Sequence, residues 1–299
     1  MACYSPLSGW RARQPEPSGK YRIVFSPNQG YLDMPMTVPC GQCVGCRLDR
    51  SKAWAIRCVH EASLHDENCF ITLTYNNENL PPDGSLDVTH FQKFMKRLRK
   101  RYAGKQIRFF HAGEYGSTLG RPHYHAILFG HDFDDRVHFK RTKAGSRLDR
   151  SAILESLWPF GYSSVGDCTF DSAAYVARYI MKKITGDDAD DHYQGLKPEY
   201  TTMSRRPGIA SEWFRRFSSD VYPSDEIIIK GKVLKPPRYY DSMYELIDED
   251  GYNEIKSKRL REARKRSAEN CSERLAVRRK VKEKQVTFLK RGLSEVNNQ

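Results

Sequence analysis

The stretch Arg121-Pro122-His123-Tyr124-His125-Ala126-Ile127-Leu128-Phe129-Gly130 decides how the fold of this chain is interpreted. Its apolar run predicts a β-strand, and side chains alternate between the two faces of a strand. His123 and His125 therefore point to the same face, where two imidazoles can bind one divalent metal ion. A His-x-His pair is a weak signal by itself, so its meaning depends on the rest of the chain.

A second segment, Tyr175-Val176-Ala177-Arg178-Tyr179-Ile180-Met181-Lys182-Lys183, predicts a helix over 172–184 that Asp171 or Ser172 can cap. One apolar stripe recurs at helical spacing: Ala173, Val176, Ala177, Ile180 and Ile184. At roughly 100° per residue, Tyr175, Tyr179 and Lys182 lie on the opposite side of this helix. Because other residues fill the core-facing stripe, we expect the two phenols and the ammonium group to face a site.

Two tyrosines near a metal site suggest phosphodiester chemistry. A tyrosine hydroxyl has a pKa of about 10, so it is a poor nucleophile at neutral pH without help. A metal ion can polarise a phosphodiester, neutralise charge on its oxygens and orient it for in-line attack. Attack by Tyr175 or Tyr179 would give a covalent phosphotyrosine, and Lys182 can stabilise the phenolate or the phosphate. The energy of the phosphodiester is conserved, so the strand can be rejoined later.

These two motifs resemble those of the HUH endonuclease superfamily, which includes rolling-circle replication initiators and relaxases. Tyr175-x-x-x-Tyr179 is similar to the pattern of two-tyrosine members, and residues 70–76 are similar to the upstream strand and threonine-rich turn. Within that superfamily, the chain resembles the replication initiators of gokushoviruses, which are small icosahedral single-stranded DNA phages of the microvirus family. The resemblance extends from residue 2 to about residue 290 and is strongest in five segments: 39–47, 113–116, 157–159, 173–183 and 203–209.

The resemblance implies a metal-dependent enzyme. In this superfamily the histidine pair binds Mg²⁺ or Mn²⁺, and one or two tyrosines attack the DNA strand. Two histidines leave such an ion under-coordinated, and Mg²⁺ prefers oxygen ligands. A predicted strand at 107–114 and a turn at 116–120 would form a hairpin with the histidine strand, which brings Glu114 close to His123. Related initiators take an acidic ligand from this strand, so we expect Glu114 to be the third ligand rather than a solvated edge residue.

The order of the predicted elements favours an α+β fold. It is strand 70–75, helix 89–102, strand 107–114, strand 123–129 and helix 172–184. Strands mixed with covering helices fit an antiparallel central sheet better than a doubly wound parallel one, and the resemblance implies the ferredoxin-like or RRM-like core of HUH enzymes. We predict four regions: a cysteine-containing N-terminal region (1–65), the endonuclease core (66–185), a mixed accessory region (186–250) and a basic helical tail (251–299).

Cys40, Cys43 and Cys46 follow one another at a spacing that suits thiolate coordination of Zn²⁺. A fourth ligand is needed, and the candidates are Cys3, Cys58 and His60. An iron–sulfur cluster is less suited, because the bacterial spacing would place a fourth cysteine where Arg50 stands. We predict structural zinc, with Cys3 as the preferred fourth ligand; reduced and partly buried thiols without metal are the alternative.

The composition indicates a polyanionic partner. The 299 residues carry a formal net charge of +13, and residues 254–299 contain 15 Lys+Arg against 6 Asp+Glu. The resemblance implies that this partner is single-stranded origin DNA, and Arg205 and Arg206 on a turn before a predicted helix suit phosphate groups. The tail predicts one or two basic helices, or a disordered segment, that contact phosphate without sequence preference.

Other expectations come from motifs that the sequence lacks. We find no signal peptide and no apolar run near about 18 residues, so we expect no membrane span and a location in the cytoplasm of the bacterial host. The 8 cysteines then fit a reducing compartment. No Gly-x-x-x-x-Gly-Lys-Ser/Thr motif is present, so we expect the chain to depend on a host helicase as well as a host polymerase.

Together these features predict a rolling-circle replication initiator that nicks and rejoins single-stranded DNA at the viral origin through a 5′-phosphotyrosine intermediate. One alternative is a relaxase or transposase with the same chemistry. The other is a non-catalytic, zinc-dependent DNA-binding protein. That second alternative explains the charge and the cysteines, but it leaves the histidine pair and the tyrosines unexplained.

Overall fold

The structure is a computed structural model that describes residues 3–17, 19–116, 120–142, 145–178, 183 and 188–288. The described chain forms two compact units. The larger unit consists of the described residues from 50 to 260. The smaller unit joins the described residues up to 49 with residues 261–288, so it combines the two terminal regions of the chain.

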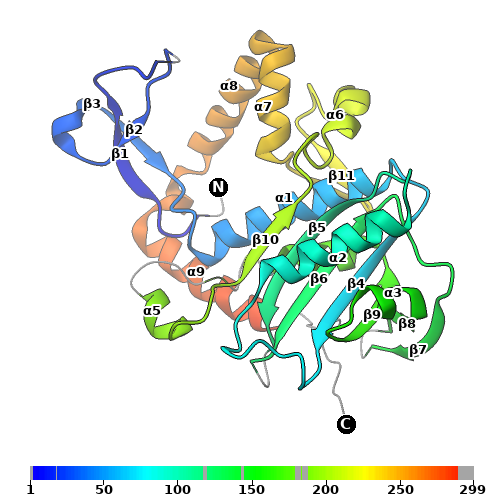
Figure 1. The fold of residues 1–299 in the computed structure, drawn as a ribbon. Coiled ribbons are helices and arrows are strands. Elements are labelled where there is room, and N and C mark those ends of the chain that lie inside the picture. The colour runs from blue at the N-terminus through cyan, green and yellow to red at the C-terminus, as the bar shows by residue number, and fades with distance from the viewer. Residues whose placement is uncertain are drawn as a thin grey trace. The chain divides into compact units, whose positions relative to one another are not determined.

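A sheet of seven described strands organises the larger unit (Figure 1). The strands are β4 (Asn68–Tyr75), β5 (Arg108–Tyr115), β6 (Pro122–Phe129), β7 (Val137–Arg141), β8 (Arg147–Arg150), β9 (Gly161–Asp167) and β10 (Tyr200–Met203). Their order is β10-β5-β6-β4-β9-β8-β7, and every neighbouring pair is antiparallel. The predicted α+β class with an antiparallel central sheet is therefore confirmed, and the histidine strand β6 lies in its interior.

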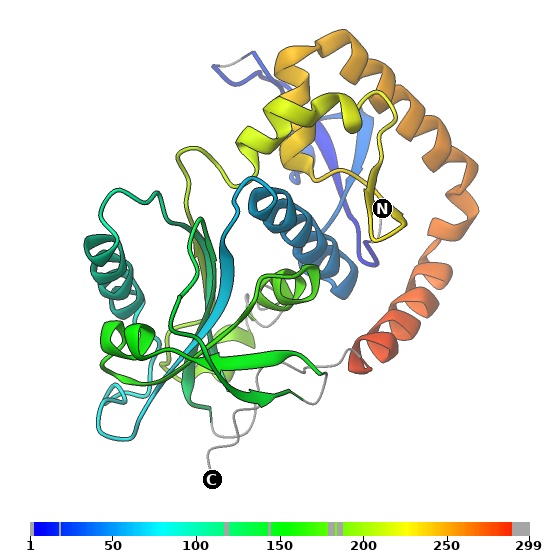
Figure 2. The same ribbon diagram turned by 90° about the vertical axis from the view of Figure 1, so that its right-hand side faces the viewer.

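Helices cover both faces of this sheet (Figure 2). They are α1 (Val44–Ala62), α2 (Val88–Arg101), α3 (Ala152–Leu157), α4 (Phe170–Arg178), α6 (Ser211–Phe217) and α7 (Arg238–Ile247). Helices α2 and α3 share a hydrophobic cluster with Leu73 and Tyr124 on one face. Helices α4, α6, α7 and the C-terminal part of α1 share the other cluster with Phe70 and Ile127. Strand alternation places His125 on the α4 face, opposite Tyr124.

Two helices begin earlier than predicted, because a different residue caps each of them. Helix α2 begins at Val88 and is capped by Asp87, whose side chain accepts a hydrogen bond from the backbone N–H of Thr89. Helix α4 begins at Phe170. Before it, the backbone N–H of Thr169 donates to the Ser172 hydroxyl at 2.7 Å, and the N–H of Ser172 donates to the Thr169 hydroxyl at 3.1 Å. This reciprocal pair satisfies N–H groups that a helix start leaves without partners.

The rest of the larger unit contains further helices and short strands. These are α5 (Asp188–Tyr193), the 3-10 helix η3 (Ser218–Asp220), β11 (Ile227–Ile229), β12 (Lys232–Leu234) and the first part of α8 (Glu249–Lys265). Arg259 on α8 forms salt bridges with Asp225 at 2.5 Å and Asp241 at 2.8 Å. Both carboxylates are buried, so this one guanidinium ties α8 to α7 and to the turn before β11.

The smaller unit contains a second antiparallel sheet and the C-terminal helices. Its elements are β1 (Leu7–Ala12), β2 (Ile23–Val24), the 3-10 helix η1 (Pro27–Gln29), β3 (Gly30–Val38), the start of α1, the end of α8, the 3-10 helix η4 (Ser267–Asn270) and α9 (Ser272–Thr287). The strand order is β2-β1-β3. The described part of the basic tail, up to residue 288, thus forms two α-helices, as one of the sequence alternatives predicted.

Candidate active site and cysteine cluster

Three neighbouring strands bring the predicted metal ligands to one face of the large sheet. The antiparallel register pairs His125 on β6 with Thr72 on β4 and with Ala112 on β5. The same register pairs Glu114 on β5 with His123, as the predicted hairpin required. Residues paired across an antiparallel sheet point to the same face. The site is therefore built from the interior of the sheet rather than from its loops.

His125 is fully buried between two hydrogen-bonding partners. Its Nδ1 atom lies 3.0 Å from the hydroxyl oxygen of Thr72, and its Nε2 atom lies 3.0 Å from Oε1 of Glu114. Glu114 is 1% exposed, so its carboxylate lies in the interior and interacts there with the imidazole. Buried carboxylates of this kind are costly unless they have a partner, which explains why the two side chains face each other.

His123 has its tautomer fixed by the backbone. Its Nδ1 atom lies 2.7 Å from the carbonyl oxygen of Arg121, and because a carbonyl only accepts, Nδ1 carries the proton. The lone pair is therefore on Nε2. The guanidinium of Arg121 in turn donates to the carbonyl oxygen of Tyr75 at 2.8 Å and to the side chain of Asn77 at 2.5 Å. Burial, assisted by nearby His125, lowers the pKa of His123, which favours the neutral form that a metal ion needs.

The three predicted ligands share one face but are not gathered around a single point. The ring centroids of His123 and His125 are 6.4 Å apart. Among the described residues, the only group of three or more His, Cys, Asp or Glu whose ligand atoms lie within 4.8 Å of one another is a cysteine cluster elsewhere in the chain. In the site itself, Glu114 is hydrogen-bonded to His125. In this structure, two of the three predicted ligands therefore bind each other through a hydrogen bond.

Tyr175 lies against this site, although on a different side of its helix from the one predicted. It is 4% exposed and belongs to the hydrophobic cluster, so the prediction that it faces away from the core was wrong. Its ring meets the His125 ring edge to face, with centroids 5.4 Å apart and planes at 86°. The reason is that α4 is buried along a wide arc rather than one stripe: Ser172, Ala173, Tyr175, Val176 and Ala177 are all buried. The core face and the site face of α4 are the same.

The other two predicted catalytic residues, Tyr179 and Lys182, lie outside the described residues. The described part of the tyrosine helix ends at Arg178, whose guanidinium carbon lies 5.8 Å from the centre of the Tyr175 ring. Contact of a guanidinium with an aromatic ring is mildly attractive. A positive charge therefore lies beside Tyr175 in addition to any that Lys182 would supply.

His111, the other histidine near Glu114, lies on the opposite face of the sheet. Its ring stacks on Phe91 of α2 with centroids 3.5 Å apart. Its Nδ1 atom lies 3.0 Å from the hydroxyl oxygen of Thr202 on β10. His111 is fully buried there, and burial strongly lowers its pKa. It is a structural histidine, separated from the site by the thickness of the sheet.

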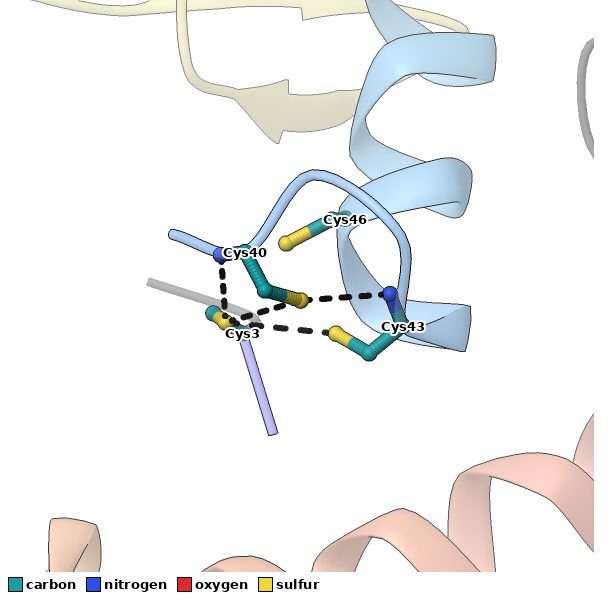
Figure 3. Close-up of side chains that lie close together, drawn as sticks. All are labelled: Cys3, Cys40, Cys43 and Cys46. Carbon is teal, nitrogen blue, oxygen red and sulfur yellow. Dashed lines mark hydrogen bonds between the residues drawn. The ribbon is translucent and has the colours of Figure 1, made fainter. Parts of the chain in front are cut away.

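Four cysteines of the smaller unit form a cluster whose thiol groups point toward one another (Figure 3). Cys40, Cys43 and Cys46 come from the loop before α1 and its first turn, and Cys3 comes from the N-terminal segment before β1. The sulfur of Cys3 lies 3.7 Å from that of Cys40 and 4.0 Å from that of Cys43. Four sulfurs around a tetrahedral Zn²⁺ at about 2.3 Å would be about 3.8 Å apart. The spacing therefore fits a metal ion, and a disulfide would need sulfurs at about 2.05 Å.

The fourth member of the cluster is Cys3, and the two alternatives have other surroundings. Cys58 is completely buried in the hydrophobic cluster of the larger unit. His60 has its Nδ1 atom 2.8 Å from the Tyr240 hydroxyl and its ring stacked on Trp213. Burial lowers the pKa of His60 to about 4, so this ring is neutral at pH 7 and belongs to the core.

Backbone N–H groups point at the cysteine sulfurs, as they do where sulfur carries negative charge. The N–H of Tyr4 donates to Cys43 Sγ at 3.3 Å, the N–H of Cys40 donates to Cys3 Sγ at 3.3 Å, and the N–H of Cys43 donates to Cys40 Sγ at 3.3 Å. Burial raises the pKa of Cys43, but N–H···S bonds from Tyr4 and Cys46 outweigh it and lower that pKa to about 6. A thiolate is the form that binds metal.

Arg205 and Arg206 lie away from the histidine site. They are exposed in the turn after β10, which leaves the sheet near the first residue of β5, whereas Glu114 lies near the other end of β5. Six residues of strand separate these ends by about 20 Å. The start of α6 already has an anionic partner, because the N–H of Ala210 donates to the Glu61 carboxylate at 2.6 Å. The structure therefore does not bring these two arginines together with the histidine site.

Two residues that contact the histidines were not predicted from the sequence, Thr72 and Arg121. Thr72 lies in the threonine-rich strand that resembled the superfamily motif, and Arg121 opens the histidine motif. Their residue types gave no signal of a partner. Alternation along β4 places Thr72 on the site face, but its pairing with His125 depends on the register between two strands that are about fifty residues apart.

Comparison with known proteins gives a family for this chain. Residues 68–184 match the family model of the replication-associated protein ORF2. The chain is 33% identical over 243 residues to the replication-associated protein VP4 of Bdellovibrio phage phiMH2K, covering 76% of each chain. It is 32% identical over 287 residues to the replication-associated protein ORF2 of Spiroplasma virus 4, covering 89% of this chain and 88% of that one.

A third relative is the replication-associated protein ORF4 of Chlamydia phage 1, which is 35% identical over 244 residues, or 79% of this chain and 60% of the relative. No solved structure matches this chain at a significant level. Among the helices that the structure describes, none is both long and apolar enough to cross a membrane. The matched segment 68–184 contains the whole histidine site and Tyr175.

Proposed function

We propose that this chain, which belongs to the family of replication-associated proteins of gokushovirus-type phages, starts replication by nicking one DNA strand at the phage origin and later rejoining it. Membership of that family supports a role in replication. The chemistry of the step is our inference from the histidine site. Of the alternatives, a relaxase or transposase would use the same chemistry for a different task, and the phage relatives favour replication.

A single observation supports this chemistry most directly. Tyr175 on α4 meets His125 edge to face at 5.4 Å, and His125 lies between Thr72 and Glu114 on the same face of the sheet. A non-catalytic DNA-binding protein has no need for a buried carboxylate, two histidines and a tyrosine on one sheet face. A metal-dependent phosphodiester transferase would use all of them, because its ligands must hold a cation next to its nucleophile.

The donor atoms fit a divalent cation, and we propose Mg²⁺ or Mn²⁺. Nε2 of His123 carries a lone pair because its Nδ1–H donates to a carbonyl. Nε2 of His125 also carries a lone pair when Nδ1 is protonated and donates its hydrogen bond to the Thr72 hydroxyl. That hydroxyl can accept as well as donate. Glu114 adds the oxygen that hard cations prefer, by exchanging its hydrogen bond to His125 for the cation. Such a cation would polarise the reacting phosphate and neutralise the charge on its oxygens.

The proposed reaction transfers a phosphoryl group between two oxygens. The hydroxyl oxygen of Tyr175 or Tyr179 attacks phosphorus, and the bond from phosphorus to the 3′ oxygen breaks with its electron pair on that oxygen. The tyrosine loses one proton and the 3′ oxygen gains one. The products are a 5′-phosphotyrosine and a free 3′ hydroxyl that a polymerase can extend. Rejoining is the reverse step, in which a 3′ hydroxyl attacks the phosphotyrosine.

The remaining predicted residues take supporting roles in this proposal. Two tyrosines one helical turn apart, Tyr175 and Tyr179, would allow one to attack while the other still carries DNA. Lys182 would stabilise the phenolate or the phosphate. Arg205 and Arg206 would contact the backbone of the origin DNA at a distance from the cut. A host helicase would separate the strands, and a host polymerase would extend the new end.

We also propose that the cysteine cluster holds a structural Zn²⁺. The sulfurs of Cys40 and Cys43 lie 3.7 and 4.0 Å from that of Cys3, which matches the edge of a zinc tetrathiolate, and all four sulfurs lie within 4.8 Å of one another. The smaller unit has few buried apolar residues with which to hold its sheet together. A metal ion that ties Cys3 to the loop before α1 would supply the missing constraint.

The test of the nicking mechanism is formation of a covalent adduct. The purified full chain is incubated with Mn²⁺ and overlapping single-stranded oligonucleotides that tile the phage genome, and the products are separated on a denaturing gel. We expect one family of oligonucleotides to give a protein adduct, which peptide mass spectrometry assigns to Tyr175 or Tyr179. The adduct should disappear with EDTA, with His123→Ala and with the double replacement of both tyrosines by Phe.

Tyr102→Phe is the matched control, because Tyr102 follows α2 and packs against the hydrophobic cluster on the opposite face of the sheet. It should form adduct at the rate of the unmodified chain. Adduct that persists in the double Tyr→Phe variant would show that another residue is the nucleophile. DNA binding without adduct under all metal conditions would favour the non-catalytic DNA-binding alternative.

A further inference from the structure

Tyr4 connects the cysteine cluster to helix α9 within the smaller unit. It follows Cys3 directly, and its backbone N–H donates to Cys43 Sγ at 3.3 Å. Its ring is buried, and the guanidinium carbon of Arg278 on α9 lies 5.9 Å from the ring centre. Whatever fixes Cys3 and Cys43 therefore also fixes the surface on which α9 packs.

Helix α9 has little else to hold it in place. Leu275 is its only buried residue in the described structure. Burying one leucine contributes roughly 1.5–3 kcal/mol, and an isolated helix of about 16 residues is marginal in water. The packing of α9 therefore also depends on the contact between the Arg278 guanidinium and the ring of Tyr4 in the N-terminal segment.

Charge makes that contact sensitive to metal. Four thiolates around one Zn²⁺ carry a net charge of about −2, because each thiol loses its proton on binding. Arg278, and Arg279 next to it in the chain, place two guanidinium groups on the helix that packs on this segment. Loading the cluster would thus both fix Tyr4 and attract α9. Without metal, the N-terminal segment loses the link from Cys3 to the loop before α1.

The docked tail presents a strongly basic surface. Residues 261–288 contain ten Lys+Arg and four Asp+Glu. Some of these charges are paired within the tail, as in the bridges of Arg274 to Glu269 and of Arg279 to Glu283. Lys280 and Lys284 are exposed and add to the excess. A positively charged surface suits the phosphate backbone of DNA. Along α9 it lacks the aromatic side chains on which bases stack, so it is not expected to distinguish between sequences.

We infer that metal loading of Cys3, Cys40, Cys43 and Cys46 docks α9 and so assembles a second, sequence-independent DNA-backbone contact from the two ends of the chain. The choice of DNA as the partner rests on the proposed function. The docking of α9 by the metal-loaded cluster does not. The two parts are measured separately, and both are independent of cleavage by the histidine site.

Hydrogen exchange of the full chain tests the docking. The chain is compared after zinc loading and after chelation, with bound zinc measured by elemental mass spectrometry. We expect one Zn²⁺ per chain, and amides of α9 that exchange at least about tenfold faster after chelation, which corresponds to about 1.4 kcal/mol of lost protection. Arg278→Gln should speed exchange in α9 with zinc still bound, whereas Lys280→Gln should leave it unchanged. Equal protection with and without bound zinc would overturn the docking.

Salt-dependent binding tests the partner. The affinity of the zinc-loaded chain for a duplex without origin sequence is measured from low to high NaCl. The double variant Lys280→Gln, Lys284→Gln should lower the slope of log K against log[salt] by about 1 to 2, since each lost phosphate contact removes about 0.9. An unchanged slope, or tighter binding to anionic phosphatidylglycerol vesicles than to DNA, would overturn the DNA assignment. Tyrosine-adduct formation on a short origin strand should be unaffected, so failure here is distinct from failure of the nicking proposal.

Discussion

Replacing Thr72 by valine tests how the site orients its buried histidine. Thr72→Val keeps the shape of the side chain and its preference for a strand, and removes only the hydroxyl that lies 3.0 Å from Nδ1 of His125. In the variant, Nδ1 faces a methyl group where the hydroxyl stood. Two consequences are expected, one for stability and one for metal binding.

The loss of stability follows from the buried nitrogen. His125 is 0% exposed and Thr72 is 5% exposed, so water does not replace the lost hydroxyl without rearrangement. Removing one partner of a buried hydrogen bond costs roughly 1–3 kcal/mol. For a unit of this size, each kcal/mol lowers Tm by about 2–4 °C. Thermal unfolding should therefore shift down by roughly 2–12 °C.

The effect on metal binding follows from the tautomer. His125 can offer Nε2 to a cation only when its proton is on Nδ1, and the Thr72 hydroxyl is the acceptor for that proton. Removing such a positioning partner typically costs about 10–100-fold in metal affinity. The Mn²⁺ concentration that gives half-maximal adduct formation should rise by that factor. Saturating Mn²⁺ should restore most of the rate, because the nucleophile is untouched.

Thr202→Val is a matched control on the opposite face of the same sheet. It removes a hydroxyl that also lies 3.0 Å from Nδ1 of a fully buried histidine, His111. We expect a similar loss of stability and no change in the Mn²⁺ requirement. If both variants lose stability but Thr72→Val needs no more Mn²⁺ than the control, His125 is not oriented by Thr72 for metal binding and the proposed ligand set is wrong.

Three further predictions concern charge and protonation. Burial lowers the pKa of His60 to about 4 in the folded chain, whereas its pKa in the unfolded chain is about 6.5. The free energy of unfolding should therefore be highest above pH ~6.5 and fall by about 3 kcal/mol as the pH drops toward 4. His60→Gln should flatten urea-unfolding stability over that window, whereas His138→Gln, in an exposed ring, should not. Arg259→Ala should lower the free energy of unfolding by about 2–3 kcal/mol, because it leaves two buried carboxylates without their cation. This figure is reduced to allow for solvent, since the Arg259 side chain is 31% exposed. Arg259→Lys should recover part of the lost stability in the same unfolding assay. Arg121→Ala should raise the half-saturating Mn²⁺ by about tenfold while leaving DNA affinity unchanged, since it loosens the carbonyl that orients His123.

The sequence predicted the parts of this molecule that depend on local periodicity. The alternation in β6 placed His123 and His125 on one face, and the short connection to β5 placed Glu114 beside His123. The predicted antiparallel sheet follows from the same short-range information, because strands separated by tight turns pair with each other. The cysteine spacing within residues 40–46 is also local.

Features that depend on distant contacts were predicted incompletely or wrongly. The position of Tyr175 was wrong because helical periodicity shows which residues are apolar, and it does not show that the sheet beneath the helix carries a histidine. Cys3 was one of three candidates because it lies 37 residues before Cys40 in the chain, with a sheet between them. The partner of His125 depended on a strand register, and a slip of one residue would have turned Thr72 to the other face.

The hydrogen bond between Glu114 and His125 explains how this site can be stable without the proposed cation. A lone buried carboxylate would cost several kcal/mol, so an Nε2–H that donates to Glu114 stabilises the closed form. In that form the Thr72 hydroxyl must donate to Nδ1, whereas cation binding requires it to accept. The proton therefore moves from one ring nitrogen to the other, with no net uptake or release, and the hydroxyl rotates to follow it. His123 needs no such change, because its proton is held on Nδ1 by a carbonyl in both forms. Under the proposed mechanism the two histidines are thus unequal: His123 could bind a cation as it stands, whereas His125 would have to exchange its hydrogen bond with Glu114 for the cation.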